Sequence, residues 1–147
     1  RGTVGVIVQA VDGVGERQWV HPVRESWLAV ETTVRFARGG LDPIRLAGNH
    51  VIMATGATYA LYAHLAPGSV AVTRGQRVRV GEVLGRVGHT GNSTAPHLHF
   101  HLMDSPDPLQ AGGIPCAFAA YLLERDGQWQ RVERGIPHRR ERIRPVS

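Results

Sequence analysis

Short apolar runs separated by glycine-containing turns occupy the middle of this 147-residue chain. Residues 51–53 and 59–65 are two such runs, and the turn between them, at residues 55–58, predicts a β-hairpin. Three further runs predict more strands, at residues 70–72, 78–80 and 83–87. Strands of this length, broken by turns about every 8–12 residues, favour an antiparallel all-β sandwich or open barrel.

The segments on either side of this region complete the predicted domain. Residues 4–11 predict a first strand, which Asp12-Gly13 ends in a turn. Downstream, we expect a strand at residues 97–103, a short strand or helical turn at residues 117–123, and a last strand at residues 128–133 that pairs across the Asp126-Gly127 turn. We therefore predict a single domain over residues 1–134, with an irregular insertion at residues 16–47, and a basic tail at residues 135–147.

Composition excludes several classes of protein. Hydrophobic residues make up 42% of the chain, but no apolar run approaches the roughly 20 residues of a transmembrane helix, so we predict no transmembrane segment. The chain opens at Arg1 and runs at once into a strand. No signal peptide is visible, and we expect the sequence to begin inside a larger protein. The single cysteine, Cys116, excludes an internal disulfide and a zinc ribbon.

Charge and missing motifs narrow the possible partners. The net charge is +5, and the last 17 residues, 131–147, hold six Arg and two Glu. A basic tail can contact nucleic acid, lipid headgroups or an anionic cell-wall polymer, although a solvated tail is the simpler interpretation. No aromatic residue follows Trp129, so we predict no nucleic-acid partner. The chain has no Lys to carry a covalent cofactor, which excludes a lipoyl or biotinyl carrier. Phosphate-loop and dinucleotide-binding motifs are also missing. Nothing in the sequence predicts an oligomeric state.

Histidines alternate with apolar residues over residues 97–102. On a strand, His97, His99 and His101 share one face, about 7 Å apart, and the apolar residues between them can pack into the core from the other. Neutral imidazole is a good zinc ligand, and two neighbours on one face can reach a shared centre, one as a ligand and one as a catalytic group. The alternative is that these histidines line a solvated sheet face.

The region from Gly48 to Met103 resembles the core of lysostaphin-type (LytM-like) zinc metalloendopeptidases, of the duplicated hybrid motif superfamily. Three motifs at matching spacing carry the resemblance: Tyr62-Ala63-His64-Leu65, Gly91-Asn92-Ser93-Thr94 and Pro96-His97-Leu98-His99-Phe100. The resemblance implies an all-β fold, a Zn²⁺ cofactor, and hydrolysis of peptide bonds in bacterial cell-wall peptidoglycan. It also implies an extracellular, periplasmic or cell-wall-associated location.

The resemblance implies roles for three histidines. His99 matches a zinc ligand, His97 matches a catalytic histidine that acts on the attacking water, and His64 matches a second catalytic histidine near that water or the developing oxyanion. The other histidines with no motif support, His50, His89 and His138, are expected at the surface.

The chain departs from the family at the two remaining zinc ligands. In the family these come from a His-x-x-x-Asp motif upstream of the first clear strand, and no such motif occurs here. One account is that the sequence starts downstream of the motif, so that the fragment is inactive. The other is a catalytically inactive wall-binding or regulatory module. His21 and Glu25 have the spacing of a replacement pair, but they lie in the insertion.

Overall fold

The computed structural model describes residues 3–16, 40, 42 and 46–146. The predicted insertion, with His21 and Glu25, lies almost wholly outside these residues. All strand pairs in the described part are antiparallel, which confirms the predicted all-β class, whereas the sandwich or barrel arrangement stays a prediction. The strands are β1 (Thr3–Val11), β2 (Asn49–Thr55), β3 (Thr58–Leu65), β4 (Arg77–Arg79), β5 (His99–Met103), β6 (Gly113–Ile114), β7 (Phe118–Arg125), β8 (Gln128–Gly135) and β9 (Ile143–Arg144).

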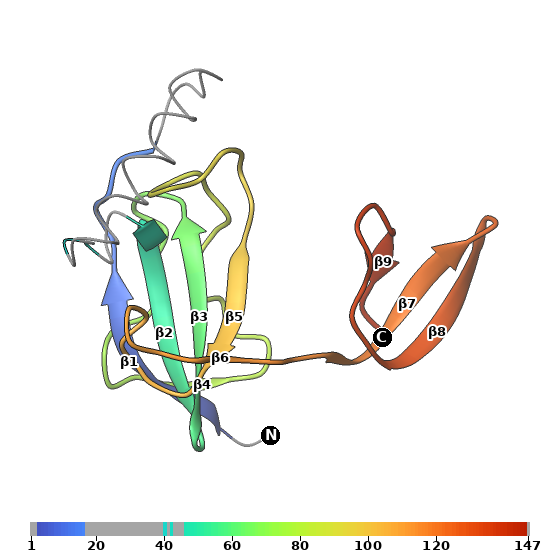
Figure 1. Ribbon diagram of the computed structural model, residues 1–147, viewed down its shortest axis with the longest axis horizontal. Helices are drawn as coiled ribbons and strands as arrows, with labels where there is room; N and C mark the ends of the chain where they lie inside the picture. Colours follow the sequence, from blue (N-terminus) through green and yellow to red (C-terminus); the bar gives the residue numbers. More distant parts are fainter. Residues whose placement is uncertain (1–2, 17–39, 41, 43–45, 147) are drawn as a thin grey trace. The chain divides into compact units, whose positions relative to one another are not determined.

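The chain divides into two compact units, Arg1–Ile114 and Pro115–Ser147. The first unit holds a six-stranded sheet in the order β4-β1-β2-β3-β5-β6, whose central strands lie side by side in Figure 1. The predicted first strand and the predicted hairpin are confirmed as β1 and as β2 with β3. This sheet carries the histidines of interest, because β5 pairs directly with β3.

Both faces of the first sheet are covered by apolar side chains, because consecutive strand residues point to opposite sides. One buried cluster comprises Ile7, Val51, Met53, Ala60, Leu65, Val72 and Val78. The other cluster comprises Ala47, Ile52, Leu61, Ala63 and Met103. The second cluster continues along β3 and β5 towards the histidines, so the candidate site lies on that face.

The segment between β3 and β5 contains less strand than its apolar pattern predicts. Of the three predicted runs, only residues 77–79 form a strand, β4. The other two runs are held by isolated backbone hydrogen bonds instead of regular strand pairing, such as the bond from Ala71 N–H to the Leu84 carbonyl at 2.9 Å. Val72 and Val78 are nevertheless buried, so the pattern predicted which side chains enter the core but not how the backbone is paired.

Strand β5 is shorter and less covered than expected. It begins at His99 rather than His97, and His97 instead forms an isolated bridge with Gly88. Leu98 and Phe100 are 45% and 39% exposed, so the apolar face of this strand is only partly covered. In the described part of the chain, only the two-residue β6 pairs with the outer side of β5, and it reaches no further than Leu102 and Met103.

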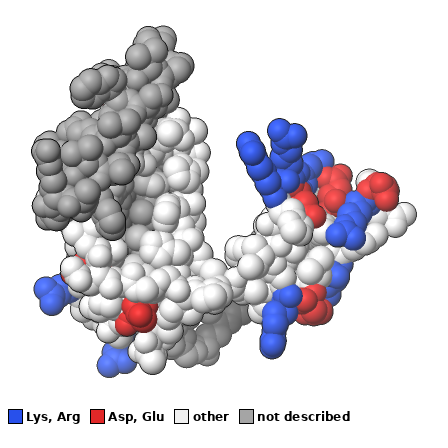
Figure 2. Space-filling view, in the orientation of Figure 1, with Lys and Arg blue, Asp and Glu red and all other residues white. Residues whose placement is uncertain are grey.

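The second unit is a three-stranded sheet in the order β8-β7-β9. The predicted pairing across Asp126-Gly127 is confirmed, and the segment before this turn is a strand, not a helical turn. Part of the predicted tail forms β9, where the Arg144 guanidinium lies 4.3 Å from the centre of the Trp129 ring. Figure 2 shows Arg and acidic side chains interspersed on this unit. Among the described residues, no helix has the length and apolar character needed to cross a membrane.

Candidate metal and catalytic site

A β-bulge determines where the His64 side chain points. Asn49 pairs with Leu65 while Val51 pairs with Tyr62, so two residues of β3, Ala63 and His64, lie opposite one residue of β2. His64 also has a left-handed backbone, with φ of 62°. Regular alternation would send Ala63 and His64 to opposite faces, yet both line the same pocket. Such conformations are uncommon for residues other than glycine and concentrate at functional sites.

The ring of His64 is anchored to the backbone of a neighbouring loop. Its Nδ1–H donates to the Thr90 carbonyl at 2.8 Å, and the residue is 5% exposed. Thr90 is held in turn, because its hydroxyl donates to the Leu65 carbonyl and accepts from Asn49 N–H, both at 2.9 Å. Burial lowers the pKa of His64 below 6.5, against the opposing effect of the Thr90 hydrogen bond, and the charges of His97 and His89 lower it further. His64 is therefore neutral at neutral pH, with the lone pair on Nε2.

Backbone hydrogen bonds bring His97 beside His64. Gly88 N–H donates to the His64 carbonyl at 3.0 Å, and the Gly88 carbonyl accepts from His97 N–H at 3.2 Å. A side chain on Gly88 would meet the backbone nitrogen of Ala66 at 2.4 Å, so only glycine allows this approach. The His97 ring is oriented by Nδ1–H, which donates to the Ala95 carbonyl at 2.7 Å. Its Nε2 is then the ring nitrogen with a lone pair.

Three imidazoles converge at this point. Potential ligand nitrogens of His64, His97 and His99 all lie within 4.8 Å of one another. The ring centres of His64 and His97 are 4.8 Å apart, and those of His64 and His99 are 5.7 Å apart. Zinc binds neutral imidazole nitrogen, and the ring orientations leave lone pairs for it on Nε2 of His64 and His97. The donor chemistry of the cluster therefore fits a zinc ion, although the described residues bring no carboxylate into it.

His99 and His101 share a face of β5, as their alternation predicts. Nε2 of His99 lies 2.8 Å from Nδ1 of His101. Burial lowers the pKa of His99, as do the charges of His101, His64 and His97 in that order. The pKa of His101 is lowered by burial. Both rings are therefore neutral at neutral pH, which is the form that metal binding requires.

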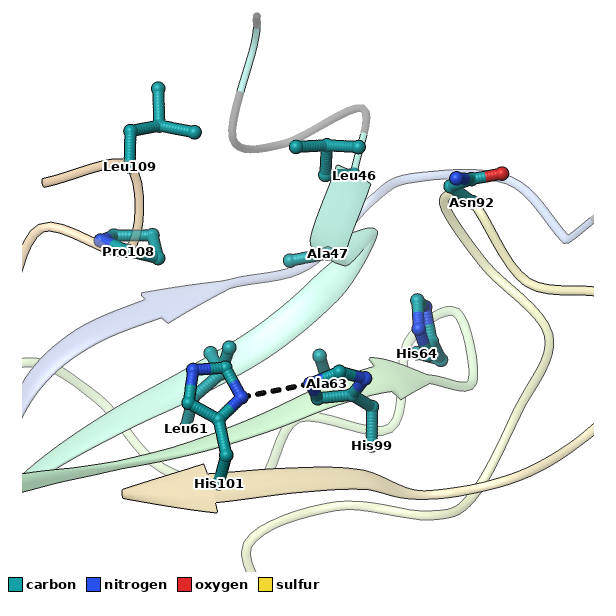
Figure 3. Close-up of a pocket in the computed structure, with 10 residues that line it drawn as sticks. All are labelled: Leu46, Ala47, Leu61, Ala63, His64, Asn92, His99, His101, Pro108 and Leu109. Atoms are coloured by element: carbon teal, nitrogen blue, oxygen red, sulfur yellow. Dashed lines mark hydrogen bonds between the residues drawn. The ribbon is translucent and has the colours of Figure 1, made fainter. Parts of the chain in front are cut away.

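An open pocket of about 250 Å³ adjoins these histidines. Figure 3 shows His64, His99 and His101 at its polar side. Its remaining wall is largely apolar and is formed by Leu46, Ala47, Leu61, Ala63, Pro108 and Leu109, with Asn92 at the edge. A mostly apolar concavity with a few convergent polar groups is typical of a binding site.

Two histidines expected at the surface are buried instead. His89 is 6% exposed, and its Nδ1–H donates to the Ser93 hydroxyl at 2.9 Å. His50 is fully buried, its Nδ1–H donates to the Gly48 carbonyl at 2.7 Å, and its Nε2 has no hydrogen-bond partner among the described residues. The prediction that both lie at the surface was wrong. It rested on the absence of a motif around them, whereas burial depends on packing against distant segments. His138 is exposed as predicted.

Sequence reasoning also missed the residues that support His64. Asn49 and Thr90 are fully buried and carry its anchoring network. Gly48 and Gly91, which both have positive φ, pack backbone against backbone beside them. The neighbouring glycines, Gly48 and Gly91, are the sequence signal that could have indicated Asn49 and Thr90. Two chain segments that approach so closely leave no room for a side chain, so each needs a glycine there.

Comparisons with known proteins identify the family of this chain. The family model described as peptidase family M23 matches residues 29–111, more than half of the chain. DD-carboxypeptidase/endopeptidase Mpg of Neisseria meningitidis is 31% identical over 144 residues, which cover 80% of this chain and 32% of the relative. Peptidoglycan DD-endopeptidase ShyA of Vibrio cholerae is 40% identical over 74 residues, 48% of this chain and 17% of the relative.

A third relative matches over a shorter stretch. Glycyl-glycine endopeptidase ALE-1 of Staphylococcus capitis is 52% identical over 42 residues, 29% of this chain and 11% of that protein. The chain thus spans about a third or less of the length of each of these relatives. The family model and the relatives together show that the chain belongs to peptidase family M23.

Proposed function

We propose that this chain is part of a zinc-dependent metalloendopeptidase that hydrolyses peptide bonds of bacterial cell-wall peptidoglycan. One relative is named as a DD-carboxypeptidase/endopeptidase, one as a peptidoglycan DD-endopeptidase and one as a glycyl-glycine endopeptidase. Such a substrate places the enzyme outside the cytoplasm, in an extracellular, periplasmic or cell-wall-associated location.

The observation that carries the proposal is the orientation of the histidine rings. Nδ1–H of His64 and of His97 is held by a backbone carbonyl, so Nε2 of each ring presents its lone pair. Both rings lie within reach of His99. Three imidazoles held together can serve metal and proton chemistry, whereas a wall-binding module has no chemical need for them.

We assign His99 as a zinc ligand and His97 and His64 as the catalytic histidines. A zinc ion held there would supply Lewis-acid chemistry, activating water and polarising the carbonyl of the bond to be cut. His97 Nε2 can accept a proton from the attacking water, and His64, kept neutral at pH 7 by the lowered pKa, can accept a hydrogen bond or a proton at the same centre.

The assignment leaves this zinc site incomplete within the described residues. A catalytic zinc site usually has three protein ligands, and His99 supplies one of them. The described residues contribute no Asp or Glu to the cluster. We therefore propose that residues 1–147 by themselves bind zinc weakly and do not cleave peptidoglycan.

The test compares residues 1–147 with the longest polypeptide that the gene encodes. Both are incubated with purified peptidoglycan, and newly released amino groups are counted. We expect release by the longer polypeptide alone, its loss on chelation, and its recovery on adding zinc. His97→Ala and His64→Ala should each lower the rate by at least about 100-fold, the usual contribution of a general acid or base.

The matched control is His138→Ala, which removes an exposed histidine in the second unit and should leave the rate unchanged. Hydrolysis that persists in a fully chelated sample would contradict the zinc assignment. Sedimentation of both polypeptides with peptidoglycan without any release of amines would instead support the alternative, a catalytically inactive wall-binding or regulatory module.

A further inference from the structure

The hydrogen bond between His99 and His101 is a further feature of this site. The two residues are separated by one position on β5, and their side chains rise from the same face of the strand. Nε2 of His99 and Nδ1 of His101 are 2.8 Å apart, and the ring planes meet at 78°. In Figure 3 the other ring nitrogen of His99 points away from His101, to the side of the pocket where His64 lies.

The direction of this hydrogen bond decides what His99 offers to the cluster. A neutral imidazole carries one N–H and one lone pair, and which nitrogen carries the proton follows from the hydrogen bonds. If Nε2–H of His99 donates to His101, the lone pair of His99 is on Nδ1. If Nδ1–H of His101 donates instead, Nδ1 of His99 carries a proton and cannot hold a metal.

We propose that His101 is a positioning residue for His99: its Nδ1 accepts the hydrogen bond from His99 Nε2–H and thereby directs the Nδ1 lone pair of His99 to the centre shared with His64 and His97. This inference rests on the proposed function, in which His99 is the zinc ligand. It assigns to His101 a role that the resemblance to the family leaves open.

General metal chemistry supports the inference. A metal-ligating histidine almost always donates its second ring nitrogen to a carboxylate, a backbone carbonyl or a water, and this partner fixes the tautomer and the ring orientation. Here the neighbouring imidazole stands where such an acceptor is needed, at hydrogen-bond distance. His64 and His97 use backbone carbonyls for the same purpose, so all three rings of the cluster are oriented through their second nitrogen.

Backbone pairing between β5 and β3 holds His99 and His101 in the positions that allow their hydrogen bond. His99 pairs with Ala63, and His101 pairs with Leu61, so both are held in register by β3. Ala63 and Leu61 are buried on the same face and place no polar group beside His99. A substitution at His101 therefore removes the acceptor without removing backbone pairing.

The test reads the tautomer directly in the zinc-free protein. Residues 1–147 are labelled with ¹⁵N at histidine, and long-range ¹H–¹⁵N spectra at pH 8 show which nitrogen of His99 carries the proton. We expect the Nε2–H form in the natural chain. His101→Phe, which keeps a ring but removes the acceptor, should give a mixture of both tautomers.

Two further variants separate positioning from a general loss of structure. His101→Asn retains an acceptor, Oδ1, where Nδ1 stood, and should restore the Nε2–H form. His138→Phe makes the same replacement at an exposed site and should change nothing at His99. An Nδ1–H form of His99 in the natural chain, or an unchanged Nε2–H form in His101→Phe, would overturn the inference.

A zinc titration of the same samples separates this inference from the proposed function. Zinc should shift the His99 ring signals, and His101→Phe should weaken binding about 10–100-fold, the usual effect of losing such a partner, while His101→Asn stays within a few-fold of the natural chain. Equal affinity of His101→Phe and the natural chain would overturn the positioning role. Because residues 1–147 are expected to bind zinc weakly, the titration extends to a large excess of zinc. If His99 is unchanged even there, the ligand assignment of the proposed function fails, and the tautomer result still decides the role of His101.

Discussion

Replacement of Gly48 by alanine should strongly destabilise the first unit and disturb the candidate site. Gly48 has φ of +63°, and a Cβ built on it would lie 2.4 Å from Thr90 Oγ1, 2.5 Å from the Thr90 carbonyl carbon and 2.6 Å from the backbone nitrogen of Gly91. Two of these atoms belong to the backbone, so no side-chain rotation relieves the overlap. Thr90 must move, and its carbonyl is the group that orients His64.

Two effects add to the cost. An alanine in the left-handed region loses about 1–2 kcal/mol relative to a right-handed conformation. Forcing an extra carbon into a closely packed interior costs about 1–3 kcal/mol more. Together they lower the free energy of unfolding by roughly 2–5 kcal/mol, a large fraction of the typical stability of about 5–15 kcal/mol. At about 2–4 °C for each kcal/mol, the value for about 150 residues, that corresponds to a drop in Tm of roughly 4–20 °C.

The matched control is Gly56→Ala, at the other end of β2. Gly56 has φ of +70°, but a Cβ there would have no atom within 4 Å, so only the backbone effect of about 1–2 kcal/mol applies. Urea denaturation followed by fluorescence measures both changes. In Gly48→Ala, the His64 ring signals should also shift in a ¹⁵N spectrum. Equal destabilisation by the two variants would refute the reasoning that the contact with Thr90 dominates.

Three further predictions concern single side chains. Burial lowers the pKa of His50 in the folded chain, so the unfolded chain takes up a proton at a higher pH than the folded chain does. The free energy of unfolding should therefore fall as the pH drops below about 6.5. His50→Phe should reduce this pH dependence in urea titrations between pH 5 and 8. Because His64 has φ of 62°, His64→Gly should be more stable than His64→Ala by about 1 kcal/mol in the same assay, and equal stability would argue against the strained backbone. Burial alone would raise the pKa of Asp12, but hydrogen bonds from the N–H groups of Gly68, Gly13 and Val70 together lower it. Asp12→Ala should therefore lower the free energy of unfolding by about 1 kcal/mol at pH 7. This difference should shrink once the pH falls below about 4, where the carboxylate of the natural chain takes up a proton.

Much of the local structure follows from short-range sequence signals. The hairpin of β2 and β3 lies where two apolar runs flank a glycine turn, and the hairpin of β7 and β8 turns at Asp126-Gly127. His99 and His101 share a face because strand side chains alternate, a property that needs no tertiary information. The described chain forms two compact units that meet between Ile114 and Pro115, and the single domain over residues 1–134 stays a prediction.

The arrangement of the candidate site required contacts between distant segments. Alternation along β3 cannot place Ala63 and His64 on one side; the bulge opposite β2 and the positive φ of His64 do so. His97 reaches His64 through Gly88, 24 residues after His64 in the chain, and no pattern within a few residues encodes that bridge.

Alternation, turn residues and motif spacing act within one strand or one turn, so they were enough to predict the all-β class, the family resemblance and the histidines of the candidate site. The burial of His50 and His89, the exposure of Leu98 and Phe100, and the orientation of each imidazole became known only from the folded structure. Ring orientation depends on backbone carbonyls and neighbouring rings supplied by other segments, such as Thr90 for His64. The physical reason is that a hydrogen-bond partner brought close by folding leaves no trace in the local sequence.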